Sequence, residues 1–232
     1  MAEARPPGRV CRNLDAAVAA AVPGASGGQL ATLGGRLEEY VALVRRWAQT
    51  VNLVSRDDLP RIVDRHILPA LALRSAVRAV PHARIMDVGS GAGLPAIPLA
   101  ITLPGASFTL VESRRRRANF LRQAVRGLGL SNVAVVCGRV ERYRPPTPQD
   151  LIMSRAVADV EGLARLARHC LASTGLLLVT TGPNTQSQTG GSGAVIQFRD
   201  DRQGPVSATI ACPYQKMVTS DVSVDRVVED DA

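Results

Sequence analysis

The sequence predicts an α/β fold, in which a doubly wound parallel sheet follows an N-terminal helical segment. From about residue 81, short apolar runs of strand length alternate with longer amphipathic segments, which is typical of a parallel sheet with helices on both faces. Before that point the apolar residues recur at helical spacing instead. A chain of 232 residues suits one domain with an extension, so we expect residues 1–80 and 81–232 to form two parts of one domain.

The N-terminal segment is expected to contain three helices. Residues 1–13 are rich in Pro and Arg and are expected to be disordered, and a short helix over "LDAAVAAAV" ends before Pro23. The loop "GASGGQ" follows, and the apolar spacing then predicts an amphipathic helix over residues 30–49. A third helix is expected over residues 59–80, with a kink at Pro69.

The second part alternates between strands and helices. Strands are expected at "ARIMDV", "SFTLVE", "NVAVV", "DLIMS" and "GLLLVTT", and helices at "LPAIPLAITL", "RRRRANFLRQAVRGLGL" and "VEGLARLARHCL". After the low-complexity stretch "GPNTQSQTGGSG", three further β segments are expected at "AVIQFRD", "VSATIACPY" and "MVTSDVSV".

The composition favours a protein without metal or membrane that binds a polyanion. The net charge is +8, which favours nucleic acid as a partner, although a biased genome composition gives the same excess of Arg over Lys. The four cysteines are scattered without a CxxC and the three histidines have no metal-ligand spacing, so we expect no metal site and a reduced, cytoplasmic protein. The chain has neither a signal-peptide pattern nor an 18-residue apolar run, and nothing in it argues for more than a monomer.

A glycine loop, "DVGSGAGLPA", follows the first strand of the α/β part. Gly89, Gly91 and Gly93 form G-x-G-x-G, and Leu94 stands where a dinucleotide fingerprint has its last glycine. No Lys-Ser/Thr follows, so the loop is not a P-loop. Asp87, two residues before the first glycine, would repel a pyrophosphate and would suit a cationic amine. A plain tight turn that packs a helix on the sheet is the alternative.

A second acid, Glu112, ends the next expected strand, 23 residues beyond Gly89. A carboxylate at this position can accept hydrogen bonds from both hydroxyls of a ribose. With Asp87, the two acids indicate a nucleoside that carries an amino acid and no phosphate. S-adenosylmethionine fits this description and is the expected cofactor.

Several of these stretches together resemble one family. The stretches "IMDVGSGAGLPAIPLAI", "FTLVESRRRRANFLRQAVRGLGLSNV", "GRVE" and "SRA", with "WAQTVNLVS" and "RHILPALAL" upstream, are similar to those of the bacterial small-subunit rRNA methyltransferase G family (RsmG, also called GidB). The resemblance covers about residues 47–182. It implies a Rossmann-like, class I methyltransferase fold and methylation of N7 of one guanine in 16S rRNA of the small ribosomal subunit.

The resemblance also implies roles for individual residues. Glu112 would hold the ribose hydroxyls of the cofactor, and Asp87 would lie near its methionine amine. Arg155 of "SRA" would lie beside the cofactor and the target base. The other residues implied to contact the cofactor are Gly89, Gly91, Gly93 and Leu94 in the loop and Val140 and Glu141 of "GRVE" on the adenine side.

The chain departs from the family pattern at several positions. Ala96 replaces the final glycine of G-L-P-G, and Pro69-Ala70 replaces D-S after "RHIL". A Lys near the later strand is replaced by Thr181, and an Arg-His pair near the C-terminus by Gln215-Lys216. These changes bear on RNA affinity and target identity more than on cofactor binding.

Methylation of guanine N7 needs few catalytic groups. The N7 lone pair is free and needs no deprotonation, so alignment is expected to supply most of the barrier reduction. No N/D-P-P-Y motif or cysteine follows the fourth strand, as an exocyclic amine or pyrimidine carbon acceptor would require. Arg155 instead offers donors for guanine O6 or a phosphate, and a surface ion pair is the alternative role.

A run of arginines opens the helix after the second strand. Four cations at a helix N-terminus oppose the helix dipole, which argues against a purely structural role. We interpret the run as an RNA-phosphate site, and the alternative is a solvated charge run. The expected RNA-binding residues are Arg114, Arg115, Arg116, Arg117, Arg122 and Arg139, and Arg126 extends the same helix.

Two other function classes stay open on the sequence alone. A methyltransferase of a small molecule or protein would use the same cofactor site but needs no arginine run. An RNA-binding protein that has kept the fold without catalysis is compatible with the changes at Ala96, Thr181 and Gln215. His66 of "RHIL" is a candidate to hydrogen-bond the loop "VNLVS", with a satisfied helix-face histidine as the alternative, and Trp47 is expected in the core.

Overall fold

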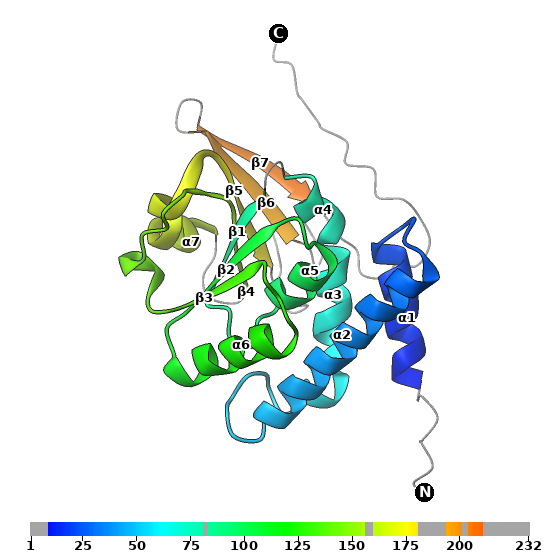
Figure 1. Cartoon of the computed structure of the whole chain (residues 1–232). Helices are drawn as coiled ribbons and strands as arrows, with labels where there is room; N and C mark the ends of the chain where they lie inside the picture. The colour runs from blue at the N-terminus through cyan, green and yellow to red at the C-terminus, as the bar shows by residue number, and fades with distance from the viewer. Residues whose placement is uncertain (1–8, 81–82, 156–159, 181–193, 201–203, 211–232) are drawn as a thin grey trace, which may run out of the picture.

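A seven-stranded sheet forms the centre of the computed structural model, which describes residues 9–80, 83–155, 160–180, 194–200 and 204–210 (Figure 1). The strand order is β3-β2-β1-β4-β5-β6-β7, parallel from β3 to β5 and antiparallel from β5 to β7. The strands are β1 (Arg84–Val88), β2 (Ser107–Glu112), β3 (Val133–Cys137), β4 (Gln149–Arg155), β5 (Leu171–Thr180), β6 (Ala194–Asp200) and β7 (Gly204–Ile210). The predicted doubly wound α/β sheet is confirmed.

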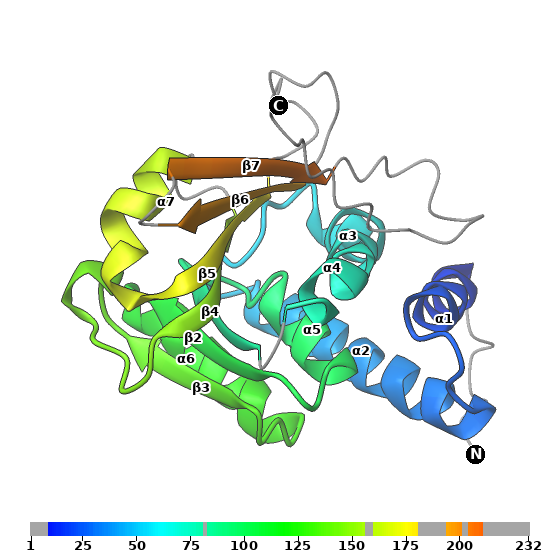
Figure 2. The same ribbon diagram turned by 90° about the horizontal axis from the view of Figure 1, so that it is seen from above.

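Helices cover both faces of the sheet. Helices α5 (Ala96–Thr102) and α6 (Arg115–Gly127) pack on one face, and α7 (Val160–Ala167) packs on the other (Figure 2). Alternate residues of β1 follow this division, since Ile85 belongs to the core on the α5 side and Met86 to the core on the α7 side. Short 3₁₀ turns lie at Val140–Arg142 and Arg168–Cys170.

The N-terminal helices form an outer layer over α5 and α6. Helix α1 (Arg9–Ala21) packs on α2 (Gly27–Trp47), and α2 contacts both α5 and α6. The buried face of α2 has the predicted helical spacing, with Leu37, Tyr40, Val41 and Val44 inward. Trp47 is half-buried and meets Phe120 edge-on, with ring centroids 5.8 Å apart.

Helices α1 and α2 both begin earlier than the sequence predicts. The prediction that residues 1–13 are disordered is wrong from Arg9 onward, because α1 begins there and no Pro or Gly interrupts residues 9–13. Residues 1–8 lie outside the described part. Helix α2 begins at Gly27 because Ser26 and Gln29 form a capping box, which stabilises a helix start within "GASGGQ".

The single helix expected over residues 59–80 is instead four short segments. They are a 3₁₀ turn (Leu59–Arg61), a π-helical turn (Val63–Ile67), α3 (Leu68–Ala72) and α4 (Arg74–Arg78). Pro69 has no N–H to donate to the carbonyl four residues earlier, and the N–H of Leu68 bonds the carbonyl of Val63 five residues earlier. The expected single kinked helix is replaced by this broken run, and the π turn before Pro69 contains Arg65 and His66.

None of the helices that the structure describes is long and apolar enough to cross a membrane.

Candidate active site

The chain crosses from one side of the sheet to the other between β3 and β4, so the reversal of strand order lies between β1 and β4. Ligands of doubly wound sheets bind at the carboxyl ends of the strands beside such a point. Strand β1 pairs with β2 on one side and with β4 on the other. Asp87 near the end of β1 therefore has Glu112 of β2 and Arg155 of β4 at the neighbouring strand ends.

The glycine loop turns sharply after β1 because three residues have positive φ. The φ angles are 73° at Gly89, 55° at Gly91 and 81° at Gly93, in the region where side chains are strained. A Cβ on Gly93 would also lie 2.5 Å from Cδ1 of Ile97 in α5. The Leu94–Pro95 peptide bond is cis. The loop thus needs its glycines for both backbone and packing reasons.

Ala96 is fully buried and is the first residue of α5. It lies beyond the positive-φ turn, and in a helix Ala is more favourable than Gly by about 1 kcal/mol. The substitution that departs from the family pattern therefore fits the local backbone without strain.

Glu112 holds the glycine loop in place. Its Oε2 accepts a hydrogen bond from the N–H of Gly91 at 2.9 Å, and its Oε1 accepts one from the N–H of Arg114 at 2.7 Å. Each carboxylate oxygen has a second lone pair, so the predicted acceptance from a ribose is chemically possible beside these bonds. The structure thus gives Glu112 a role in shaping the loop that the sequence did not indicate.

Asp87 is a buried carboxyl group with an unsatisfied oxygen. It is 1% exposed, and Oδ2 has no hydrogen-bond partner among the described residues. Burial raises its pKa to about 7; Ser90 and the positive charge of Arg155 act to lower the pKa, and the charge of Glu112 acts to raise it. A buried carboxyl without a full set of partners is unfavourable by itself, and a cationic group at Oδ2 would satisfy it.

Tyr40 of α2 reaches the same loop, which the sequence pattern did not reveal. Its hydroxyl is fully buried and donates to the carbonyl oxygen of Ala92 at 2.6 Å. Burial raises the pKa of Tyr40, so the phenol stays protonated as a donor. Helical spacing identifies Tyr40 as a core residue, but only the tertiary structure shows what its hydroxyl contacts.

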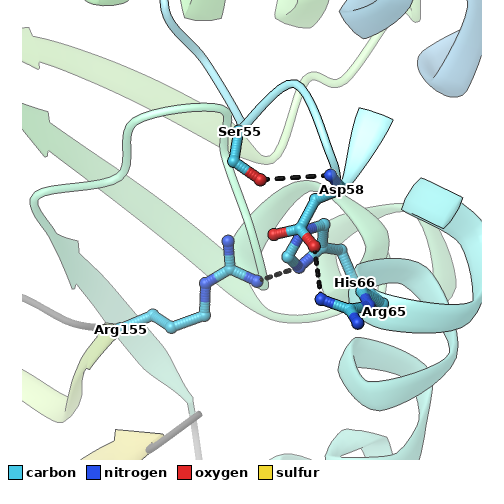
Figure 3. Close-up of polar contacts among 5 residues, drawn as sticks. All are labelled: Ser55, Asp58, Arg65, His66 and Arg155. Carbon is cyan, nitrogen blue, oxygen red and sulfur yellow. Dashed lines mark hydrogen bonds and ion pairs between the residues drawn. The ribbon is translucent and has the colours of Figure 1, made fainter. Parts of the chain in front are cut away.

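A polar cluster joins the end of β4 to the N-terminal layer (Figure 3). The Arg155 guanidinium Nη1 lies 2.6 Å from Nδ1 of His66, and Nε2 of His66 faces Oδ2 of Asp58 at 3.4 Å. Oδ1 of Asp58 is bound by Arg65 at 2.7 Å, and the N–H of Asp58 donates to Oγ of Ser55 at 3.1 Å. His66 therefore approaches Asp58, which follows the stretch "VNLVS" that was expected to bind it, and its hydrogen bond is to Arg155 instead.

Burial and charge set the protonation of this cluster. Burial, and after it the charge of Arg155, lower the pKa of His66 to about 4, while Asp58 acts to raise it. Burial acts to raise the pKa of Asp58, but hydrogen bonding by Arg65 and Ser55 and the nearby positive charges lower it overall. At neutral pH the cluster therefore contains a neutral imidazole between a guanidinium and a carboxylate.

Three of the residues expected beside the cofactor are placed differently from the loop glycines. Leu94 is 3% exposed and packs in the core on the α5 side, and Val140 is 5% exposed and packs in the core on the α7 side. Glu141 is exposed and lies 4.0 Å from Arg139. Their contact with a cofactor stays a prediction.

The arginine run lies at the carboxyl end of β2. Arg114, Arg115 and Arg116 are exposed, whereas Arg117 is half-buried and donates from Nε to the carbonyl oxygen of Asn52 at 2.8 Å. A Cβ on Gly91 would lie 3.9 Å from Nη1 of Arg117, so this guanidinium lies over the glycine loop. The structure thereby separates three exposed cations from one, Arg117, that binds the loop after α2.

The remaining expected cations lie further along α6 and before the 3₁₀ turn that follows β3. Arg139 is largely exposed before the 3₁₀ turn, and Arg126 is exposed near the end of α6. Arg122 is half-buried and donates to Oδ1 of Asn119 at 3.1 Å. Thr181, Gln215, Lys216 and the β segment "MVTSDVSV" lie outside the described residues. Within the described part, no three His, Cys, Asp or Glu side chains cluster as metal ligands.

Comparison with known proteins adds a family match. A family model described as rRNA small subunit methyltransferase G (GidB) matches residues 35–209. The protein named ribosomal RNA small subunit methyltransferase G in Methylobacillus flagellatus is 38% identical over 155 residues, covering 67% of this chain and 74% of that protein. The proteins of the same name in Chromobacterium violaceum and Laribacter hongkongensis are 41% and 43% identical, covering 63% and 60% of this chain and 69% and 66% of those proteins.

Proposed function

Because the chain belongs to the rRNA small subunit methyltransferase G family, we propose that it transfers a methyl group from S-adenosylmethionine to N7 of a guanine in 16S rRNA. The methyl group moves from the sulfonium sulfur to N7. The sulfonium becomes a neutral thioether, and the positive charge passes to the guanine. No proton is transferred, so the chain need not supply a general base.

The buried carboxyl of Asp87 is the observation that supports the cofactor site. Its Oδ2 is unpartnered, and it lies at the end of β1 beside a loop whose backbone is turned by three glycines. The methionine amine of the cofactor is a cation of the kind this oxygen needs. Glu112 lies at the neighbouring strand end, where a ribose diol of the same ligand would fall.

The chain's own residues would act by binding and alignment. Asp87 would hold the cofactor amine, and Glu112 would keep the glycine loop shaped around the nucleoside. Arg155 would bind guanine O6 or a flanking phosphate, because donation to N7 itself would block the nucleophile. Holding two reactants in line is the kind of contribution that accounts for large rate effects without an acid or base.

The exposed cations near the carboxyl ends of the strands support an anionic RNA as the partner. Arg114, Arg115 and Arg116 are exposed at the start of α6, and Arg139 is exposed after β3. Phosphate contacts from these side chains would position the rRNA without reading its sequence. This function would place the protein in the cytoplasm, where the small ribosomal subunit is assembled, and we propose that it acts as a monomer.

Methyl transfer with a labelled donor tests this proposal. We expect tritium from S-[methyl-³H]adenosylmethionine to enter 16S rRNA of small subunits that lack the modification, and to be released as 7-methylguanine on depurination. Naked 16S rRNA and intact 30S particles, assayed in parallel, identify the form of the substrate.

The same assay distinguishes the other function classes. Cofactor binding by calorimetry without label in any RNA would favour a non-catalytic RNA-binding protein. When the labelled donor is incubated with a lysate instead of small subunits, label in protein or in small molecules, with none in RNA, would favour a different methyl acceptor. Arg155→Gln is the matched variant, and we expect it to bind the cofactor and to lose most of the transfer.

A further inference from the structure

Arg155 is held by a neutral acceptor although a carboxylate is close behind it. Nη1 of Arg155 lies 2.6 Å from Nδ1 of His66, and among the described residues this is the one hydrogen bond that the guanidinium makes. Asp58 lies on the far side of the imidazole, with Oδ2 at 3.4 Å from Nε2. The order of the three side chains is therefore guanidinium, imidazole, carboxylate (Figure 3).

The chemistry of the guanidinium fixes the tautomer of His66. A guanidinium has donors only, so Nδ1 of His66 must be unprotonated and must accept. A neutral imidazole then carries its proton on Nε2, the nitrogen that faces Asp58. The second oxygen of Asp58 is bound to Arg65 at 2.7 Å, which fixes the carboxylate toward the ring.

Among the described residues, this order leaves the guanidinium of Arg155 without a carboxylate in direct contact, and the charges of Asp87 and Asp58 act on it without a salt bridge. A carboxylate in direct contact would neutralise the guanidinium, whereas an imidazole acceptor orients it without doing so. Within the described part of the chain, the other N–H groups of Arg155 make no hydrogen bond, which leaves them available to a ligand at the end of β4. The charge of Asp58 is paired with Arg65 instead.

From this arrangement we propose that Asp58 and His66 are positioning residues, which orient Arg155 toward the methyl acceptor while keeping its charge available. The inference rests on the proposed function for the role of Arg155, but the contacts among the three side chains do not, and the contact at 3.4 Å between Nε2 of His66 and Oδ2 of Asp58 is a close polar approach rather than a hydrogen bond. Both positioning residues come from the N-terminal layer, on the loop after α2 and in the π turn that precedes Pro69.

Three substitutions of His66 separate the parts of the proposal. His66→Asn keeps a neutral acceptor near the Nδ1 position, His66→Leu removes the acceptor, and His66→Asp puts a carboxylate against Arg155. In single-turnover transfer to small subunits, we expect His66→Asn to stay within about threefold of wild type. We expect His66→Leu and His66→Asp each to be slower by about 10- to 100-fold, with an unchanged Kd for the cofactor.

His169→Asn is the control, because His169 is exposed and, among the residues with described positions, hydrogen-bonds a main-chain oxygen alone, that of Tyr143 at 3.0 Å. We expect it to leave transfer unchanged. Circular dichroism and cofactor titration confirm that each variant is folded. The positioning role is overturned if His66→Leu transfers as fast as wild type, or if a folded His66→Asn is as slow as His66→Leu. The role of the available charge on Arg155 is overturned if His66→Asp transfers methyl groups at the same rate as His66→Asn.

A direct measurement of the tautomer keeps this proposal separate from the proposed function. In long-range ¹H–¹⁵N spectra of the cofactor-free protein, we expect His66 as the Nε2–H tautomer from pH 5.5 to 8. In Arg155→Met, the Nδ1 resonance should move to the position of a nitrogen without a hydrogen-bond donor. A His66 that carries its proton on Nδ1 refutes the chain of contacts, whether or not the protein transfers methyl groups. A wild-type protein with the expected tautomer and no transfer to rRNA refutes the proposed function instead.

Discussion

Replacing Asp87 by Asn should stabilise the cofactor-free protein at neutral and alkaline pH. The carboxyl group is 1% exposed and its Oδ2 has no partner among the described residues. Burial is the main reason that its pKa rises from 3.8 to about 7. The folded state therefore favours the protonated acid, and ionising it in the folded protein costs free energy that an amide does not.

The size and sign follow from the linkage between protonation and folding. A pKa that moves from 3.8 to about 7 on folding corresponds to a difference of about 4 kcal/mol in the free energy of unfolding between low pH and high pH. Because the folded pKa is the higher one, this stability is fully present below pH 3.8 and is lost as the pH rises through about 7. The wild type should thus weaken over this window, by about 1.4 kcal/mol for each pH unit in the middle of the window.

Urea unfolding of wild type and Asp87→Asn between pH 4 and pH 8.5 measures this difference. We expect the free energy of unfolding of Asp87→Asn to rise relative to that of the wild type as the pH rises, and we expect this difference to level off above about pH 7.5. Asp57→Asn, which removes an exposed carboxyl from the loop after α2, is the control. A gap between wild type and Asp87→Asn that stays constant across this range would refute the burial argument. The same variant should bind S-adenosylmethionine more weakly, because it lacks the charge that pairs with the amine.

Three further predictions concern the loop and the arginine run. Gly93→Ala should lower the free energy of unfolding by about 2–4 kcal/mol, since φ is 81° and the new Cβ would lie 2.5 Å from a side-chain carbon; Gly105→Ala, which meets nothing within 4 Å, should be nearly neutral in the same urea titration. Tyr40→Phe should cost about 1–3 kcal/mol and raise the calorimetric Kd for the cofactor, because a buried carbonyl loses its donor; equal Kd values would contradict its role in the loop. Changing Arg115 and Arg116 to Ala should reduce the slope of log K against log salt for RNA binding by about 2, and an unchanged slope would show that these side chains meet no phosphate.

The sequence predicted the frame of the site well because each of its parts is local. The apolar run before the glycines, the glycine spacing and the acid at the next strand end are properties of short segments, and the structure places all of them at one edge of the sheet. The family resemblance rested on the same segments, and it is confirmed by the match over residues 35–209.

The contacts that complete the site were not predictable in this way. Tyr40 and His66 lie 52 and 89 residues from their partners Ala92 and Arg155 along the chain. Helical spacing identifies the face on which such a residue lies, but it does not identify what a polar atom at its tip will meet. The π turn at His66 was equally hidden, because a proline predicts the lost hydrogen bond but not the way the backbone replaces it.

The N-terminal layer belongs to the site as well as to the core. Leu37, Tyr40 and Val44 of α2 share one hydrophobic cluster with Ile97 of α5 and Phe120 of α6. A fragment of residues 81–232 would expose this apolar face, and it would lack the hydroxyl that holds the glycine loop and the imidazole that binds Arg155. We therefore expect the fragment to lose cofactor binding, and we expect the whole chain to unfold in one transition when followed both by circular dichroism and by Trp47 fluorescence. Two separate transitions would show that the layer folds independently, and the site would then have to form without it.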